Sequence, residues 1–215
     1  MPAPPGRKVC VLVSGGLDSA VLLRDCLRRY SEVHPVFVEA GLRWERAESY
    51  WLRRLLRAMR GKRLKPLVRL KLPVEALYGR HWSLGHGAVP SEKASWDSVY
   101  LPGRNLLLLS LAGTFCARRG IGNIAIGTLA GNPFVDSRRD FFTDMERVFR
   151  RLFGPIRVLA PLRNLHKDAV VRRAAGLPAE FTFSCIDPRG VRPCGRCTKC
   201  FERREGFRKA GFPSL

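Results

Sequence analysis

The chain has 215 residues, and 39 lysine and arginine residues against 18 acidic residues give it a formal net charge of +21. This length suits one hydrophobic core with an appendage better than two full domains. Hydrophobic residues make up 46% of the chain, yet no apolar run reaches the roughly 20 residues of a membrane span. The chain begins without a signal-peptide pattern, so we expect a cytoplasmic protein with no membrane partner.

Strands and helices alternate through the first third of the sequence. Apolar runs typical of buried strands alternate with segments whose apolar residues recur at helical spacing. The predicted strands are 8–13, 32–40 and 64–72, and the predicted helices are 17–30 and 43–60. This order predicts an α/β fold with a doubly wound parallel sheet, covered by helices on both faces.

A stretch without periodicity follows, from Pro73 to Tyr100, and its length suggests a functional loop. The alternation then resumes with predicted helices at 105–120, 141–154 and 164–176 and predicted strands at 123–128 and 155–162. Parallel sheets bind ligands beyond the carboxyl ends of their strands. We therefore expect the segments 14–19 and 127–132 to face one crevice.

The turn after the first strand reads Ser14-Gly15-Gly16-Leu17-Asp18-Ser19. Glycines allow positive φ and close approach, and the amides at the start of the next helix favour an anion. The turn is neither a G-x-x-x-x-G-K-[ST] phosphate loop nor a G-x-G-x-x-G dinucleotide turn. It resembles the pyrophosphate-binding PP-loop of ATP-using adenylating enzymes. The alternative is that serine and aspartate only cap an ordinary helix.

Four cysteines gather near the end of the chain, at Cys185, Cys194, Cys197 and Cys200. Two-residue spacings let thiolates converge on one ion, and four cysteine ligands are typical of a structural zinc site. An iron–sulfur cluster is an alternative, whereas disulfides are not expected without a secretory signal. The segment 181–215 thus reads as a small zinc-binding appendage to a nucleotide-binding domain at 1–180.

Together these motifs resemble the 7-cyano-7-deazaguanine synthase family of the queuosine and archaeosine pathways, within the PP-loop ATP pyrophosphatase superfamily. The resemblance runs from about Lys8 to Gly211. Its landmarks are the Ser14–Ser19 turn, Pro102-Gly103-Arg104-Asn105, the pair Pro161 and Lys167, and the cysteine pattern ending in CFERREGF. The resemblance implies that ATP adenylates 7-carboxy-7-deazaguanine, that ammonia gives an amide, and that a second ATP drives dehydration to the nitrile.

The resemblance also implies roles for individual residues. Lys167, Asp18 and Arg104 are the expected catalytic residues, with Asp18 the carboxylate best placed to reach Mg²⁺. Arg104 and Lys167 suit phosphate contacts through their cationic groups. The expected ATP-binding residues are Ser14, Gly15, Gly16, Leu17, Asp18, Ser19, Gly103, Arg104, Asn105 and Gly127.

One segment departs from the family pattern. Where the family carries an aspartate and then S-G-Y-P-D-x-R, this chain reads GTLAGNPFVDSRRDFF. Asp136 and Arg138 match the last acid and base, and Phe134 stands near the tyrosine, so these three are the expected substrate-binding residues. Trp44 also replaces a histidine of the family.

Two other functions remain open at this stage. A paralogue acting on another carboxylate or amine would fit the altered segment, and a tRNA-modifying or RNA-binding protein would fit the charge of +21. The basic residues are spread along the whole chain, which a solvated arginine-rich surface explains equally well. We expect a small-molecule substrate and ammonia, we do not expect a nucleic acid, and the sequence leaves a homodimer open.

Overall fold

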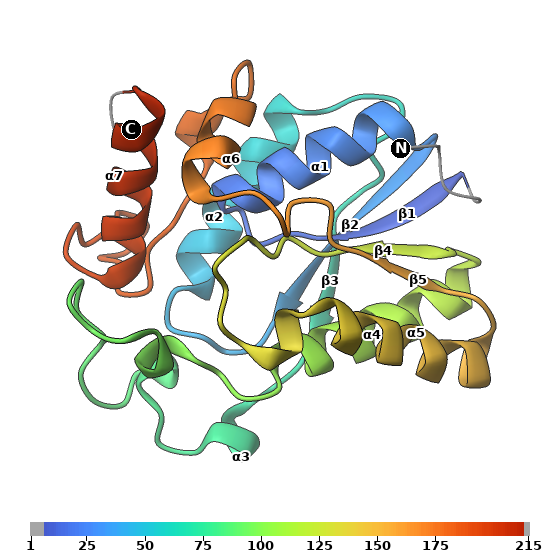
Figure 1. Ribbon diagram of the computed structural model, residues 1–215, viewed down its shortest axis with the longest axis horizontal. Helices are drawn as coiled ribbons and strands as arrows, with labels where there is room; N and C mark the ends of the chain where they lie inside the picture. Colours follow the sequence, from blue (N-terminus) through green and yellow to red (C-terminus); the bar gives the residue numbers. More distant parts are fainter. Residues whose placement is uncertain (1–6, 213–215) are drawn as a thin grey trace.

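The computed structural model describes residues 7–212, and these form a five-stranded parallel sheet with helices on both faces (Figure 1). The strand order is β3-β2-β1-β4-β5. The strands are β1 (Lys8–Leu12), β2 (Glu32–Glu39), β3 (Val68–Lys71), β4 (Asn123–Ala125) and β5 (Arg157–Leu159). The predicted doubly wound α/β fold is confirmed.

The helices cover the two faces of the sheet in two groups. Helices α1, α2 and α6 pack on one face with part of α7, and α4 and α5 pack on the other. Their bounds are α1 (Leu17–Arg29), α2 (Glu45–Ala58), α3 (Glu75–Tyr78), α4 (Arg104–Arg119), α5 (Arg139–Phe153), α6 (Lys167–Arg173) and α7 (Thr198–Ala210). Short 3₁₀ turns occupy Trp82–Leu84, Trp96–Val99, Val135–Ser137 and Ala179–Phe181.

The central strand β1 explains why the core has two halves. Its side chains alternate, so that Val9 and Val11 join the hydrophobic cluster under α1, whereas Cys10 and Leu12 join the cluster under α4 and α5. All four are buried. A strand buried on both faces reads as a continuous apolar run, which is why the sequence reveals it.

Several predicted elements are shorter in the structure; the strands predicted at 64–72 and 155–162, for example, span Val68–Lys71 and Arg157–Leu159. Two of the shortened ends lie beside the carboxyl edge of the sheet. The strand predicted at 123–128 ends at Ala125, and the helix predicted at 164–176 spans Lys167–Arg173. The amide of Leu165 donates to the carbonyl of Leu162, so the chain turns before α6 begins. Both shortened ends border the carboxyl edge of the sheet, where the backbone leaves regular structure.

A third hydrophobic cluster lies beyond this edge. It joins Trp44 and Ala47 at the start of α2 to Leu101 and to Phe183 and Ile186 of the C-terminal segment. The segment 72–103, between β3 and α4, is therefore packed against the C-terminal part of the chain.

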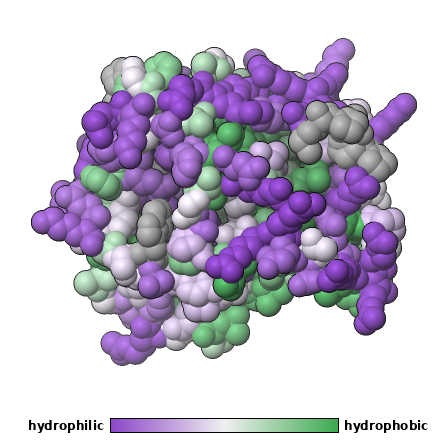
Figure 2. Space-filling model, in the orientation of Figure 1, coloured by the Kyte–Doolittle hydropathy of each residue, from purple (hydrophilic) through white to green (hydrophobic). Residues whose placement is uncertain are grey.

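Hydrophilic side chains cover much of the face shown in Figure 2, as expected from the even spread of basic residues along the sequence. Within residues 7–212, no helix combines the length and apolarity needed to cross a membrane.

Candidate active site

A cavity of about 980 Å³ opens at the carboxyl ends of β1, β2 and β4. Parallel sheets hold their ligands at this edge, and the volume is that of a small-molecule site. The segment 127–132 lines the cavity, and so do Ser14, Gly16, Asp18 and Ser19 of the glycine turn. The two segments expected to share one crevice therefore do so, except that Leu17 turns into the core and the buried Gly15 is outside the set of lining residues.

The glycine turn is held open by its own hydroxyls. Ser19 Oγ donates to the carbonyl of Gly16 at 2.9 Å, and Ser14 Oγ accepts from the amide of Gly16 at 3.3 Å. Helix α1 follows Gly16, and no side chain caps its first turn. The alternative in which serine and aspartate cap this helix is therefore wrong, and the amides of its first turn remain available to an anion.

Gly15 has to be glycine for two reasons. Its φ is +82°, and a Cβ added there would lie 3.1 Å from the carbonyl oxygen of Glu48 and 3.2 Å from Cβ of Leu52 in α2. Its own carbonyl accepts a hydrogen bond from the amide of Phe183 at 2.8 Å. The turn is thus clamped between α2 and the C-terminal segment.

Lys167 and Asp18 form an ion pair on one wall of the cavity. Lys167 Nζ lies 2.8 Å and 3.0 Å from the two carboxylate oxygens of Asp18, and Glu202 Oε1 is 3.7 Å away. Burial lowers the pKa of Lys167, but the two carboxylates outweigh burial, so its pKa lies above the ordinary value. The ammonium group is therefore charged at neutral pH, next to the glycine turn.

Arg104 and Asn105 begin α4 directly after Gly103. The Arg104 side chain lines the cavity, and no carboxylate within residues 7–212 forms a salt bridge with it. Asn105 is committed elsewhere, because its amide donates to Asp136 Oδ2 at 3.0 Å and its side chain donates to the Asp136 carbonyl at 2.9 Å. Arg104 is thus free to meet an anion, whereas Asn105 holds the segment 127–136 in place.

The three expected substrate-binding residues lie in different surroundings. Phe134 lines the cavity and stacks on Tyr100, with ring centroids 4.5 Å apart. Asp136 is buried and also lines the cavity. Arg138 is exposed at the start of α5 and is outside the set of lining residues. The structure therefore brings the first two residues to the site but not the third.

Sequence analysis missed Glu48, which lies on α2 and lines the same cavity. Burial raises the pKa of its carboxyl to about 8, with Arg104 acting in the opposite direction and Glu45 adding to the rise. A signal was present, since Glu48 interrupts the apolar stripe formed by Trp44, Leu52 and Leu55 at spacings of four, four and three residues. An acid on such a stripe is worth singling out.

Two further lining residues were also missed. Tyr100 follows a 3₁₀ turn in an aperiodic loop, where no sequence pattern marks it. Glu202 belongs to the CFERREGF landmark, but only the structure reveals that its carboxylate lies beside Lys167.

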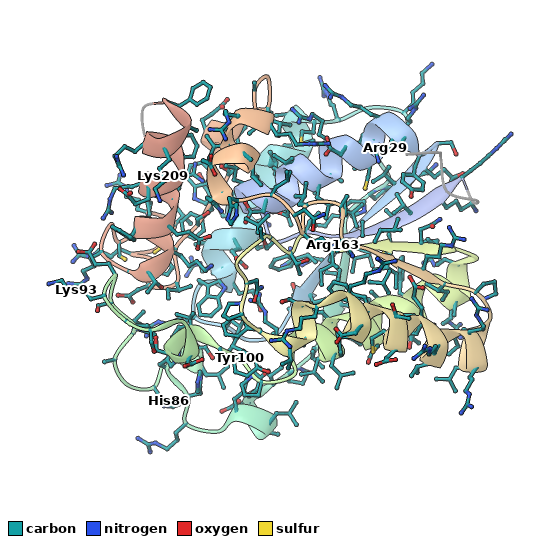
Figure 3. All side chains as sticks on the ribbon, viewed as in Figure 1. Arg29, His86, Lys93, Tyr100, Arg163 and Lys209 are labelled. Atoms are coloured by element: carbon teal, nitrogen blue, oxygen red, sulfur yellow. The ribbon has the colours of Figure 1, made fainter. Side chains whose placement is uncertain are left out.

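The segment 72–103 forms the outer wall of the cavity and is attached to the C-terminal segment. Ser91 pairs with Cys197 in an antiparallel bridge, and Glu92 forms a salt bridge with Arg204 at 3.2 Å. Lys93 follows on the exposed side of this loop, and Tyr100 lies nearer the centre of the molecule (Figure 3). The wall is therefore tied to the cysteine cluster.

The four cysteine sulfurs converge as a metal site requires. Their Sγ atoms all lie within 4.8 Å of one another, and those of Cys185 and Cys197 are 3.9 Å apart. Tetrahedral zinc with Zn–S bonds of about 2.3 Å gives S–S distances of about 3.8 Å. The amides of Asp187 and Cys194 donate to Cys185 Sγ at 3.3 Å and 3.2 Å, which stabilises a thiolate. The donor set therefore fits a zinc ion.

Comparison with known proteins decides the family. A family model described as "Queuosine biosynthesis protein QueC" matches residues 8–211. The chain belongs to the QueC family. Among its relatives, the 7-cyano-7-deazaguanine synthase 1 of Desulfitobacterium hafniense (strain Y51) is 32% identical, over 94% of this chain and 91% of that protein. The 7-cyano-7-deazaguanine synthase of Anaeromyxobacter sp. (strain Fw109-5) is 34% identical, over 97% and 95%.

A solved structure of another protein has a fold similar to that of this chain. The crystal structure of a 4-thiouridine synthetase–RNA complex with bound ATP superposes with a TM-score of 0.50 at 19% identity. It covers 96% of this chain, which spans half the length of that protein. The likeness concerns the fold alone. The relatives favour the QueC synthase function over the paralogue and RNA-binding alternatives.

Proposed function

We propose that this protein is an ATP-dependent carbon–nitrogen ligase that converts 7-carboxy-7-deazaguanine and ammonia to 7-cyano-7-deazaguanine. Overall, one carboxylic acid, one ammonia and two ATP give one nitrile, two AMP and two pyrophosphate. The observation that carries the proposal is the convergence of the glycine turn, Arg104 and Lys167 on one cavity, in a chain that belongs to the QueC family.

In this proposal the glycine turn receives the pyrophosphate leaving group of ATP. The free amides at the start of α1 and the dipole of this helix favour an anion there. Arg104 contacts a phosphate through its planar fork, and Lys167 supplies a point charge. In this proposal both cations stabilise charge that develops at the α-phosphorus.

The proposed enzyme uses two metal ions, which bind at different sites. Asp18 is the proposed carboxylate for Mg²⁺, which would neutralise phosphate charge when it is bound. Zinc would be held by Cys185, Cys194, Cys197 and Cys200. With four protein ligands the zinc site has no open position, so its contribution is structural.

On the substrate side, Phe134 and Asp136 are the proposed contacts of the deazapurine, because both line the same cavity as the glycine turn. Stacking of Phe134 on Tyr100 provides an aromatic surface for a flat base. The exposed Arg138 remains a weaker candidate. This arrangement would orient the substrate carboxylate toward the α-phosphorus of ATP.

The domain boundary near residue 180, a cytoplasmic location and activity without a nucleic acid also remain proposals. The nucleotide-binding unit would span 1–180 and the zinc appendage 181–215. Of these ranges, residues 1–6 and 213–215 lie outside the described part of the chain.

The test is a reconstitution. Zinc-loaded protein is incubated with the carboxylic acid, ATP, Mg²⁺ and ammonium, and AMP and the nitrile are quantified by chromatography and mass spectrometry. We expect two AMP for each nitrile formed. If substrate-dependent ATP–pyrophosphate exchange occurs only with another acid, the assignment to 7-carboxy-7-deazaguanine is wrong.

A further inference from the structure

Glu48 lies at the meeting point of α2, the glycine turn and the cavity. Its carbonyl oxygen is the atom nearest to a Cβ placed on Gly15, at 3.1 Å, so its backbone packs against the turn. Its side chain lines the cavity. Leu52 and Leu55 of the same helix are buried in the core, and they fix the orientation of this helix face.

The carboxyl of Glu48 has no hydrogen-bond or salt-bridge partner among the described residues. The other acids that line the cavity are engaged: Asp18 and Glu202 with lysines, Glu45 with the amides of Ala40 and Gly41, Asp136 with the amide of Asn105, and Glu92, Asp168 and Glu205 with arginines. Within residues 7–212, Glu48 donates and accepts no side-chain hydrogen bond and forms no salt bridge. A carboxyl held unpaired in a cavity is available to a ligand.

The surroundings of Glu48 also set its protonation. Burial raises the pKa of Glu48 to about 8, against the opposing charge of Arg104 on α4 and with the help of Glu45 on its own helix. The group therefore exchanges its proton close to neutral pH, which is the range in which a general acid or base is most effective.

We propose that Glu48 is a catalytic base that removes a proton from the substrate nitrogen during dehydration of the amide. This inference rests on the proposed function. After the amide oxygen has attacked the α-phosphorus and pyrophosphate has left, the intermediate carries an iminium nitrogen with two hydrogens. One proton must leave to give the imidate, and a second must leave as the C–O bond to AMP breaks and the C≡N bond forms.

In this step the Glu48 carboxylate accepts a proton from nitrogen and is thereby neutralised, while the electron pair of the N–H bond enters the carbon–nitrogen multiple bond. AMP departs with the electron pair of the C–O bond. Adenylation of the carboxylic acid involves no such proton. The proposal therefore separates adenylation of the acid from dehydration of the amide, and the loss of the Glu48 carboxylate should slow only the dehydration.

The experiment compares wild type, Glu48→Gln, Glu48→Asp and the control Glu75→Gln, which removes the same charge from an exposed position on α3. Two rates are measured: ATP–pyrophosphate exchange with the deazapurine acid, and nitrile formation from the synthetic deazapurine carboxamide with ATP. Each is recorded from pH 6 to pH 9.5, a range chosen as about 1.5–2 units on either side of the Glu48 pKa.

For Glu48→Gln we expect nitrile formation to fall by about 10²–10⁴-fold, while exchange with the acid stays within a few-fold of wild type. When the reaction starts from the acid, the amide should accumulate. Wild-type nitrile formation should rise with pH and level off above about pH 8, because the base form dominates there, and this limb should disappear in Glu48→Gln. Glu48→Asp should recover part of the rate.

Two results would overturn the inference: nitrile formation by Glu48→Gln at the wild-type rate, or equal losses in exchange and nitrile formation, which indicate a role in binding or folding. Thermal unfolding of each variant identifies the folding case. If wild type itself shows no exchange with the acid and no nitrile, the proposed function fails and this inference with it. Normal wild-type activity with an unaffected Glu48→Gln overturns the inference alone.

Discussion

Gly206 of α7 packs directly against the stem of Lys167 in α6, so that a Cβ added to this glycine would lie 2.5 Å from Cγ of the lysine. Atoms at that distance overlap, and the lysine stem or the helix has to move. The position of the Lys167 ammonium, and with it the ion pair to Asp18, thus depends on the absence of a side chain at position 206 of α7.

Gly206→Ala should therefore impair the enzyme more than it destabilises the fold. Alanine favours the helix by about 1 kcal/mol, which offsets part of the overpacking cost of about 1–3 kcal/mol. Displacing Lys167 by about 1 Å should lower ATP–pyrophosphate exchange by about 10²-fold. The control is Gly61→Ala, which meets open space. Equal exchange rates in the two variants would contradict the prediction.

The ion pair of Lys167 should be visible in stability measurements. Both side chains are less than a third exposed, at 16% and 26%, so Asp18→Asn should lower the free energy of unfolding in urea by about 1–3 kcal/mol. The pKa of Lys167 is raised in the folded state. Its stabilising effect is therefore fully present below the unfolded pKa of about 10.4 and is lost as the pH rises through the folded value. If the difference in unfolding free energy between wild type and Asp18→Asn increased above about pH 10.4, this prediction would be wrong.

Gly15→Ala tests the clamp on the glycine turn. Alanine at φ +82° costs about 1–2 kcal/mol and also collides with α2. Gly41→Ala is the matched control, because it has φ +76° with no atom within 4 Å of the added Cβ. We expect Gly41→Ala to lose stability only, and Gly15→Ala also to lose pyrophosphate exchange by about 10²-fold. Similar exchange rates in both variants would show that the close contact between Gly15 and α2 is not needed for pyrophosphate exchange.

Metal removal should loosen the cavity wall as well as the cysteine cluster. Because Ser91 pairs with Cys197, chelation of the metal should accelerate tryptic cleavage after the exposed Lys93 of this loop. Elemental analysis should find one zinc per chain, lost in Cys197→Ala and retained in Cys26→Ala, whose buried thiol lies outside the cluster. Unchanged cleavage after Lys93 in the metal-free protein would show that the wall is independent of the metal.

We expect the stacked rings of Phe134 and Tyr100 to affect binding of the deazapurine acid and not binding of ATP. Phe134→Leu removes the stack on Tyr100, and we expect KM for the acid to rise about tenfold, in keeping with a loss of about 1–1.5 kcal/mol, with KM for ATP unchanged. Arg138→Ala alters an exposed residue outside the cavity lining and should change KM less. A larger effect of Arg138→Ala would restore the assignment made from sequence.

The fold was predictable because its strands and helices carry strong local patterns. Val9 to Leu12 form an apolar run before two glycines, and this marks a buried parallel strand and the turn that follows it. The cysteine spacing likewise predicts a converging thiolate set. These signals lie within a few residues of one another, so a single sequence contains them.

Other features depend on contacts between distant segments and leave no local pattern. The lack of a partner for Glu48 becomes visible only when α2, α4 and the turn are assembled around it. Asp136 gives no sign in the sequence that it accepts from the amide of Asn105, 31 residues away. Arg138 was assigned from its place in a motif, but the start of α5 directs it to solvent.

The hydrogen bond from the amide of Phe183 to the carbonyl of Gly15 has a consequence for biosynthesis. On the ribosome the glycine turn is made 168 residues before Phe183 (183 − 15). A nascent chain that ends before Phe183 holds every residue of the turn but lacks one side of its clamp. The order of synthesis therefore delays completion of the clamp on the glycine turn until Phe183 has been added.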